Sequence, residues 1–258
     1  TVWRGGSARF FFGNNFCVNQ FIVDHWSISV SKSQEHYEDR IMRKIEVTNA
    51  TKRYRTKSGF KIILLEASFE VSEGEKVAVI GRNGAGKSTL LKLLGGVEYL
   101  DKGDIRTDLT ISWPIGFSGG FQGTLTGRDN IVFLARIYGL NENTIVRRVN
   151  EFAELGEYID MPVKTYSSGM RARLAFGVSL LIDFDCYLID EIISVGDSYF
   201  QAKSRDMFHN IYSKKTLIIV SHDKEIIREY CNSAIVLQEG RVVYYSDMEE
   251  AIHRYMDV

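Results

Sequence analysis

Residues 81–89, Gly-Arg-Asn-Gly-Ala-Gly-Lys-Ser-Thr, constrain the fold more than any other part of this chain. They fit the phosphate-binding loop pattern G-x-x-x-x-G-K-[ST] without departure. The apolar run 76–80 before the loop predicts a buried strand, and residues 89–94 after it predict a helix that Gly95 and Gly96 end. A chance glycine-rich turn would lack this strand and helix in register. We therefore interpret the stretch as a phosphate-binding loop.

The residue types of the loop suit a nucleoside triphosphate. Its three glycines let the backbone curl so that successive N–H groups point at phosphates, and the helix N-terminus adds a positive dipole end. Lys87 can reach the β- and γ-phosphates, and the Ser88 hydroxyl can hold Mg²⁺. The candidate nucleotide-binding residues of the loop are Gly81, Asn83, Gly84, Ala85, Gly86, Lys87, Ser88 and Thr89.

Composition excludes several classes of protein. The chain has 258 residues, of which 45% are hydrophobic, so it can bury a sizeable core. A net charge of -1 gives no support for nucleic-acid binding through a basic face. No apolar run is long enough to span a bilayer, although the chain can still sit against a membrane protein. The 3 cysteines, Cys17, Cys186 and Cys231, are far apart, which argues against a disulfide framework or zinc site and fits a reducing cytosol.

Residues 1–41 differ from the rest of the sequence. They mix glycine, asparagine and aromatic residues without a sustained period, and they do not resemble a secretory signal. Met42 immediately precedes the first regular pattern. Our hypothesis is that Met42 is the natural start and that the earlier residues are an artefact of cloning or gene assignment. The alternative is a short genuine extension.

After Met42, strand patterns alternate with helix patterns, which predicts a mainly parallel sheet covered by helices. Glu239-Gly240 is typical of a hairpin turn. The predicted strands lie at 44–48, 67–71, 76–80, 185–189, 216–220, 235–237 and 242–245, and the predicted helices at 89–94, 131–138, 144–155 and 170–181.

Asp190 and Glu191 follow an apolar strand at 186–189. At the carboxyl end of a strand, acidic residues face the ligand crevice of an open α/β sheet. Asp190 is placed to hold Mg²⁺, and Glu191 is placed to polarise the attacking water as a general base. An acidic pair alone is usually the start of a solvated loop, but the complete phosphate-binding loop upstream favours the catalytic interpretation.

Ser167, Ser168 and Gly169 precede the helix predicted from Met170. Such a cluster is ordinarily an N-cap, and the same geometry also makes an anion site. The cluster lies one helix and a turn before Asp190. This order along the chain favours an anion site over a simple N-cap.

From Met42 onward the chain resembles the ATP-binding subunit of an ABC transporter. Residues 81–89 match the Walker A motif, and residues 166–170 (Tyr-Ser-Ser-Gly-Met) match a variant of the LSGGQ-type signature. Residues 188–191 match the end of Walker B and the catalytic glutamate, 194–197 the D-loop, and 221–223 the switch-histidine loop. The resemblance implies a P-loop NTPase fold of the α/β class, an ABC-type nucleotide-binding domain over 42–258. Its parts would be a parallel core, an N-terminal antiparallel β subdomain and a helical subdomain at about 117–180.

Three segments are similar to the ATPases that export capsular polysaccharide from Gram-negative bacteria: residues 112–127, 166–176 and 191–197. Exporters of O-antigen or teichoic acid share parts of this pattern, and many of them carry an extra C-terminal domain. This chain ends at Val258, which favours the compact capsule type.

The resemblance assigns roles to further residues. His222 would bind the γ-phosphate and orient Glu191 and the water, with a structural histidine as the alternative. Tyr54 would stack on adenine, with a tyrosine buried between strands as the alternative. Ser167, Ser168 and Gly169 would contact ATP held by a second copy, so the resemblance implies a homodimer that sandwiches ATP twice.

The loop before the helical subdomain departs from the family pattern. A glutamine usually lies there beside Mg²⁺, and Gln122 is the nearest candidate, although it lies closer than usual to Leu125. The alternative is a loop residue that faces the permease. We expect Trp113 to pack in the core, and Phe117 and Phe121 to form an exposed patch for a membrane partner.

The resemblance implies an ATP hydrolase that uses ATP and Mg²⁺ and pairs with a polytopic permease that handles the polysaccharide. The chain would lie peripherally on the cytoplasmic face of the bacterial inner membrane and bind no nucleic acid. Export of another surface glycan is the alternative, followed by a soluble ABC ATPase without a permease.

Overall fold

The computed structural model describes residues 11–12, 16–17, 43–57, 59–115, 120–190, 198–212 and 214–255. The chain divides into two units, Thr1–Ile41 and Met42–Val258. In the first unit, the described residues form two short antiparallel strands, β1 (Phe11–Phe12) and β2 (Phe16–Cys17). The interpretation of residues 1–41 as a non-native extension stays a prediction.

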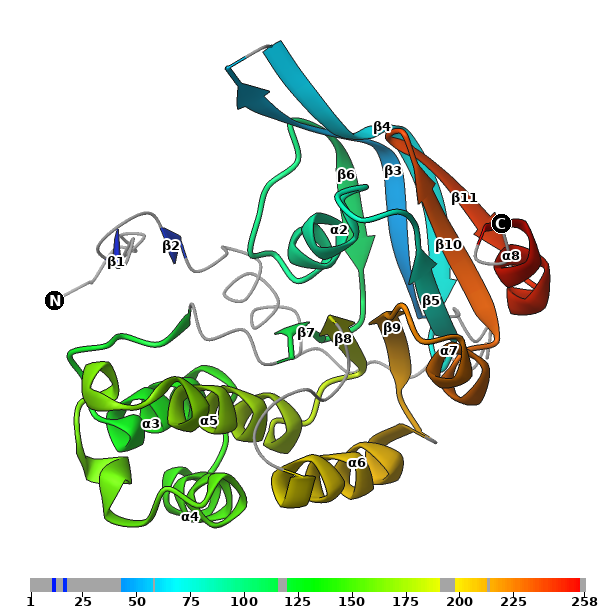
Figure 1. Ribbon diagram of the computed structural model, residues 1–258. Coiled ribbons are helices and arrows are strands. Elements are labelled where there is room, and N and C mark those ends of the chain that lie inside the picture. The colour runs from blue at the N-terminus through cyan, green and yellow to red at the C-terminus, as the bar shows by residue number, and fades with distance from the viewer. Residues whose placement is uncertain are drawn as a thin grey trace, which may run out of the picture. The chain divides into compact units, whose positions relative to one another are not determined.

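The second unit is built on a six-stranded sheet with the order β11-β10-β5-β9-β8-β7 (Figure 1). Neighbouring strands are parallel except β10 and β11, which form the hairpin predicted around Glu239-Gly240. Both turn residues have positive φ, 50° and 81°, as a tight two-residue hairpin turn requires. The strands are β5 (Lys76–Ile80), β7 (Ile111–Pro114), β8 (Cys186–Asp190), β9 (Thr216–Val220), β10 (Ser233–Gln238) and β11 (Arg241–Tyr245).

Both faces of this sheet are covered, which explains the uninterrupted apolar runs of its central strands. Val77 and Val79 of β5 pack in one cluster with helix α2 (Lys87–Leu94) and a second sheet. Ala78 and Ile80 pack in another cluster with residues from several of the helices that follow α2 in the chain. The β5 strand therefore lies in the middle of the molecule's core, with α2 leaving its carboxyl end.

The second sheet contains three antiparallel strands, β3 (Lys44–Thr56), β4 (Gly59–Ser72) and β6 (Lys102–Thr107), in the order β4-β3-β6. The sequence predicted only residues 44–48 and 67–71 of the β3–β4 hairpin. Register shifts between Val47 and Arg53 interrupt the pairing, and Asn49 and Glu66 both have φ of 50°. Because these bulges break the alternation of apolar and polar residues, the pattern hides the continuation of both strands.

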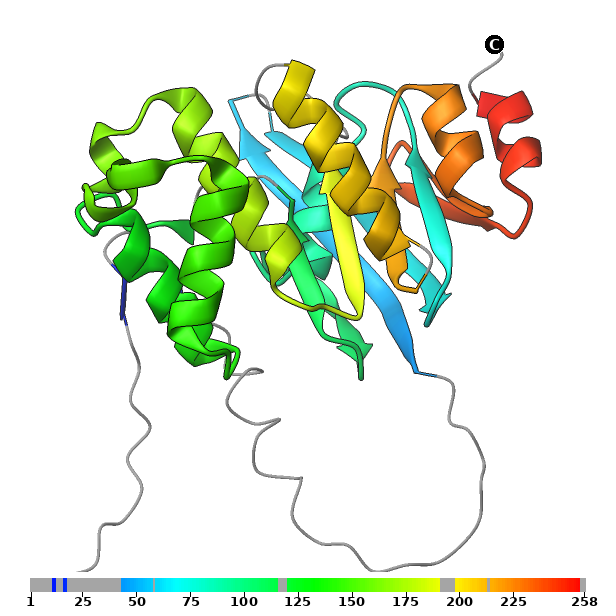
Figure 2. The same cartoon turned by 90° about the horizontal axis from the view of Figure 1, so that it is seen from below.

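Helices α3 (Gly127–Ile137), α4 (Glu142–Ala153) and α5 (Ser168–Leu181) confirm the three helical predictions after the loop. Figure 2 shows them grouped at one end of the six-stranded sheet, with α7 (Lys224–Tyr230) and α8 (Met248–Tyr255) at the other. Helix α6 (Ser198–Tyr212), α7 and α8 were not among the predicted elements, nor were the 3-10 helices η2 (Gly156–Asp160) and η3 (Val163–Thr165).

The α/β fold with a mainly parallel core, an antiparallel β part and a helical part is confirmed. Trp113 packs against the core as expected, and its indole Nε1 donates a hydrogen bond of 2.7 Å to Ser179 Oγ. The expectation of an exposed patch is wrong for Phe121, which is half-buried and packed against the same core, and Phe117 lies outside the described residues. No helix in the described part of the chain is long and apolar enough to cross a bilayer.

Helix α2 depends on burial for its stability, and Leu91 at its centre is 0% exposed. Replacement of Leu91 by Ala should lower the free energy of unfolding by about 2–5 kcal/mol, because it leaves a cavity between the two sheets. Urea denaturation followed by circular dichroism would measure the change. As a control, Arg147→Ala on the exposed face of α4 should shift it by no more than about 0.5 kcal/mol.

Candidate functional site

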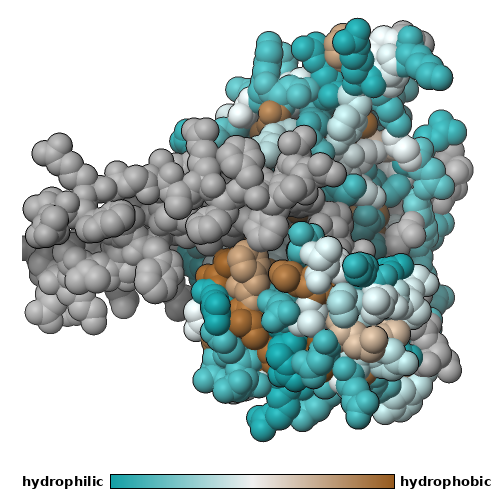
Figure 3. Space-filling model, turned by 90° about the vertical axis from the view of Figure 1, so that its left-hand side faces the viewer, coloured by the Kyte–Doolittle hydropathy of each residue, from teal (hydrophilic) through white to brown (hydrophobic). Residues whose placement is uncertain are grey.

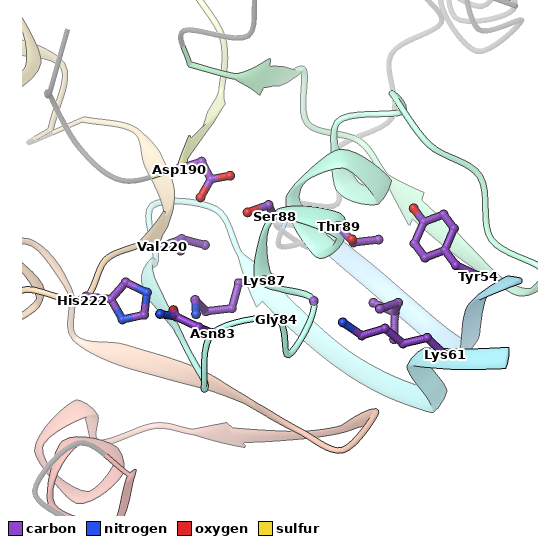
Figure 4. A pocket seen from close by; sticks show the side chains of 12 residues that line it. Tyr54, Lys61, Asn83, Gly84, Lys87, Ser88, Thr89, Asp190, Val220 and His222 are labelled. Atoms are coloured by element: carbon purple, nitrogen blue, oxygen red, sulfur yellow. The ribbon is translucent and has the colours of Figure 1, made fainter. Parts of the chain in front are cut away.

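One pocket with a volume of about 370 Å³ opens where β5, β8 and β9 end (Figure 4). The strand pairing explains how distant residues meet there. Asp190 at the end of β8 is paired with Val220 at the end of β9, and His222 follows Val220 by two residues. The lining residues are Tyr54, Lys61, Ile63, Asn83, Gly84, Gly86, Lys87, Ser88, Thr89, Asp190, Val220 and His222.

The phosphate-binding loop takes its shape from glycines at two conformationally demanding positions. Gly84 has φ of 78°, and Gly86, the N-cap of α2, has φ of 112°. A side chain would be strained at both positions, and a Cβ on Gly86 would also overlap Ile63 of β4. The loop therefore packs directly against β4 while the first N–H groups of α2 remain directed at the pocket.

Lys87 is the most buried charged residue of the loop, with 7% of its surface exposed. Its ammonium group donates hydrogen bonds to the carbonyl oxygens of Gly81 at 2.7 Å and Arg82 at 3.3 Å. These bonds hold the positive charge over the concave side of the loop, in the place where a polyphosphate would need it.

Ser88 and Asp190 offer oxygen atoms suited to a hard cation. Figure 4 shows the Ser88 hydroxyl turned towards the Asp190 carboxylate. Mg²⁺ usually takes one or two protein oxygens and completes its shell with water and substrate phosphates. No group of three or more His, Cys, Asp or Glu residues gathers as a metal site in the described ranges. The donor set fits Mg²⁺ bound together with a nucleotide.

Tyr54 closes the other end of the pocket and is 36% exposed, so the alternative of a tyrosine buried between strands is wrong. Lys52 Nζ lies 5.0 Å from the centroid of the Tyr54 ring and forms an ion pair of 2.8 Å with Glu98. Burial raises the pKa of the Tyr54 hydroxyl, which hydrogen-bonds with Thr89 and Glu98. The Lys52 ammonium lowers the pKa of Glu98. This network ties the ring to the first turn of α2 and to the segment that follows the helix.

The structure brings most of the predicted site residues together. One pocket is bordered by Tyr54, the lining residues of the loop, Asp190 and His222. The side chain of His222 is exposed at this pocket and is not buried in the core. Gly81 and Ala85 belong to the loop without lining the pocket. Glu191 lies outside the described residues, so its role stays a prediction.

The predicted signature residues Ser167, Ser168 and Gly169 are exposed at the start of α5 and do not line this pocket. Ser167 Oγ accepts a hydrogen bond of 3.1 Å from the Met170 N–H, so it is an N-cap as well. An exposed helix start is available to a second molecule, in agreement with a contact made across a dimer, although that contact remains a prediction.

Gln122 also lies outside the lining of the pocket, on the exposed loop before α3. Its backbone is held in place by the side chain of Asn130: the Gln122 N–H donates to Asn130 Oδ1 at 2.8 Å, and its carbonyl oxygen accepts from Asn130 Nδ2 at 3.2 Å. The structure does not bring Gln122 to Ser88 and Asp190, and its assignment as a metal ligand stays a prediction.

Sequence reasoning missed three lining residues, Lys61, Ile63 and Val220. Val220 could have been found as the residue before the switch-histidine motif. Lys61 and Ile63 belong to the part of β4 that the bulge hides, so only the strand pairing places them.

Comparison with known proteins agrees with the geometry. The family model described as "ABC transporter" matches residues 64–194. The capsule polysaccharide export ATP-binding protein CtrD of Neisseria meningitidis is 46% identical over 82% of this chain and 98% of its own length. The polysialic acid transport ATP-binding protein KpsT of Escherichia coli is 50% identical over 82% of this chain and 98% of its own.

Relatives named for O-antigen or teichoic acid export are less similar, such as the O-antigen export protein RfbB of Klebsiella pneumoniae, 39% identical over 76% of this chain. Among solved structures, an ATP-binding cassette bound to ADP and phosphate as a dimer has a TM-score of 0.63 at 22% identity. It covers 77% of this chain and 96% of its own chain, and it supports the fold alone.

Replacement of Tyr54 tests the base-binding end of the pocket. Tyr54→Ala should weaken ATP binding about 5- to 10-fold, because the base loses the ring face on which it stacks. Tyr54→Phe should stay within about twofold, since it keeps the ring and loses only the hydroxyl contacts. Isothermal titration calorimetry would compare the dissociation constants, and equal affinity of the Ala variant and the wild type would exclude stacking at Tyr54.

Proposed function

The chain belongs to the ABC transporter family, and we propose that it is the ATP-hydrolysing subunit of a bacterial exporter of capsular polysaccharide. One observation carries the proposal: Lys87, Ser88, Asp190 and His222, from three separate segments, border a single pocket that ends at Tyr54. Oxygen, ammonium and imidazole groups at one end and an aromatic ring at the other suit a nucleoside triphosphate with Mg²⁺.

The capsular substrate is supported by the relatives rather than by the pocket. Proteins named for capsule polysaccharide or polysialic acid export are 46–50% identical to this chain along nearly their whole length. Relatives named for O-antigen or teichoic acid export reach 38–43%. We therefore favour capsular polysaccharide over another surface glycan.

The site residues have distinct tasks in the proposed reaction. Tyr54 orients the base, while the loop N–H groups and Lys87 hold the phosphates. Bound Mg²⁺, held by Ser88 and Asp190, would neutralise charge that develops on the phosphates. His222 would hydrogen-bond the γ-phosphate and fix the attacking water, from which Glu191 would take the proton.

Two copies are needed to complete the site. Ser167, Ser168 and Gly169 are exposed at the start of α5 but absent from the lining of the pocket of their own chain. We propose that they bind the γ-phosphate of ATP held by a second copy in a two-fold homodimer. Loss of the γ-phosphate then removes the bridge between the copies, and the interface opens.

The proposed membrane partner would bind the helical part of the chain. Apolar side chains gather in one area of the lower half of the surface seen in Figure 3, the half to which the helical part of the chain belongs. The exposed apolar residues of this region are Leu125, Phe133, Tyr158 and Met161. We propose that a polytopic permease covers part of this surface and holds the chain at the cytoplasmic face of the inner membrane.

The proposed base Glu191 provides a first test. Glu191→Gln should reduce ATP turnover by about 100-fold or more and accumulate an ATP-bound dimer, because the amide cannot accept the proton. A phosphate-release assay and size-exclusion chromatography with ATP would measure both effects. Turnover at the wild-type rate would exclude Glu191 as the base.

The same variant tests the substrate in the cell. Deletion of the gene should remove capsular polysaccharide from the cell surface, and the wild-type gene should restore it whereas the Glu191→Gln gene should not. Loss of a different surface glycan with an intact capsule would contradict the substrate proposed here.

Substitution at the signature tests the shared site. Ser167→Arg should block ATP-dependent dimerisation and reduce turnover by about 10-fold or more, because a long cation cannot fit between two closed copies. Binding of ATP to the monomer should stay within about twofold of the wild type, since the side chain lies outside the pocket. If the variant still dimerises with ATP, the signature does not form the interface.

A further inference from the structure

Lys61 is a second lysine in the pocket, contributed by β4 rather than by the phosphate-binding loop. Figure 4 shows it between Tyr54 and Gly84, with its ammonium end towards Gly84. Lys61 Nζ lies 3.5 Å from the position that a Cβ on Gly84 would occupy. In the part of the chain that the structure describes, its side chain has no hydrogen-bond or ion-pair partner. Its charge is therefore available to a ligand.

The pairing of β3 and β4 fixes this placement. Lys61 is the direct cross-strand partner of Tyr54, so their side chains share one face of the hairpin. Ile63 lies two residues further along β4, on the same face, and packs against the position of Gly86. The contact between Ile63 and Gly86, which packs β4 against the loop, thus also places Lys61 over Gly84.

We propose that Lys61 binds the α- and β-phosphates of the nucleotide as a second cation, opposite the loop. This inference rests on the proposed ATP-binding function and adds a residue to it. A bound nucleotide would have its base on Tyr54 and its last phosphate near Ser88 and Asp190. The phosphates nearest the base would then pass Lys61, which lies between Tyr54 and Gly84. Lys87 holds the far end of the triphosphate, so the two lysines divide the charge between them.

Two other cations of the hairpin, Arg53 and Lys57, do not share this position. Arg53 lies over the ring of Phe60, with its guanidinium carbon 4.8 Å from the ring centroid, and its Nε is 3.9 Å from Asp101. Lys57, in the turn between β3 and β4, is exposed and does not line the pocket. Lys57 therefore offers a matched control, a lysine of the same hairpin at a distance from the proposed phosphate path.

The test compares Lys61→Met, Lys61→Arg and Lys57→Met by isothermal titration calorimetry with ATP and with ADP. Lys61→Met should weaken both nucleotides by the same factor, about 5- to 10-fold, because both carry the α- and β-phosphates. Lys61→Arg should restore binding to within about twofold, and Lys57→Met should match the wild type. The loss of affinity caused by Lys61→Met should be smaller at high salt, because salt screens the exposed ammonium group of Lys61 in the wild type. Unchanged thermal unfolding midpoints would show that all variants fold.

Two outcomes would overturn the inference. Equal affinity of Lys61→Met and the wild type for both nucleotides would show that the lysine does not contact the ligand. If Lys61→Met bound ATP more weakly but ADP as well as the wild type does, the lysine would contact the γ-phosphate rather than the α- and β-phosphates. Failure of the proposed function looks different, because the wild type itself would then bind neither nucleotide.

Discussion

The burial of α2 between two sheets is the constraint on which the site depends. Leu90 and Leu91 of this helix are no more than 1% exposed and pack in one cluster with apolar residues of both sheets. The helix can occupy that position only if the chain leaves β5 through a very tight loop, and Gly84 and Gly86 provide the positive φ angles that this needs. The packing of α2 in the core thus requires the tight shape of the phosphate-binding loop. The same packing points the N-terminus of the helix at the ligand.

The parallel sheet supplies the opposite wall of the pocket. Strands β8 and β9 are neighbours, so their carboxyl ends bring Asp190 and His222 to one pocket although the two residues are 32 positions apart in the sequence. Both strands are covered on both faces, and their apolar side chains leave polar residues only where the strands end. The arrangement keeps the reactive groups at an edge that a nucleotide, or a second copy of the chain, can reach.

The antiparallel sheet determines how the base end of the pocket is built. Lys52, which is 6% exposed, pairs with Glu98 beyond α2 and lies over the ring of Tyr54. On the neighbouring strand, Lys61 faces the loop from the cross-strand position of Tyr54. This hairpin therefore provides both an aromatic platform and positive charge, and its attachment to the loop through Ile63 couples the two ends of the pocket.

The sequence alone determined the parts of this protein whose chemistry is local. The glycine spacing and Lys87 required a phosphate-binding loop. Apolar runs and period-3.6 patterns located most central strands and helices. Asp190 was identified by its place after an apolar run, and His222 by the resemblance to the switch-histidine loop. The tertiary structure decided what depends on pairing between distant segments. The bulges at Asn49 and Glu66 hid half of the β3–β4 hairpin, so Lys61 could not be assigned to the pocket from its neighbours in sequence. Gln122 was the nearest glutamine to the expected position although its spacing is unusual, and the structure shows its backbone bound to the Asn130 side chain, outside the pocket lining. A local pattern records which face of an element is buried, whereas strand register and loop anchoring are set by contacts between residues far apart in the chain.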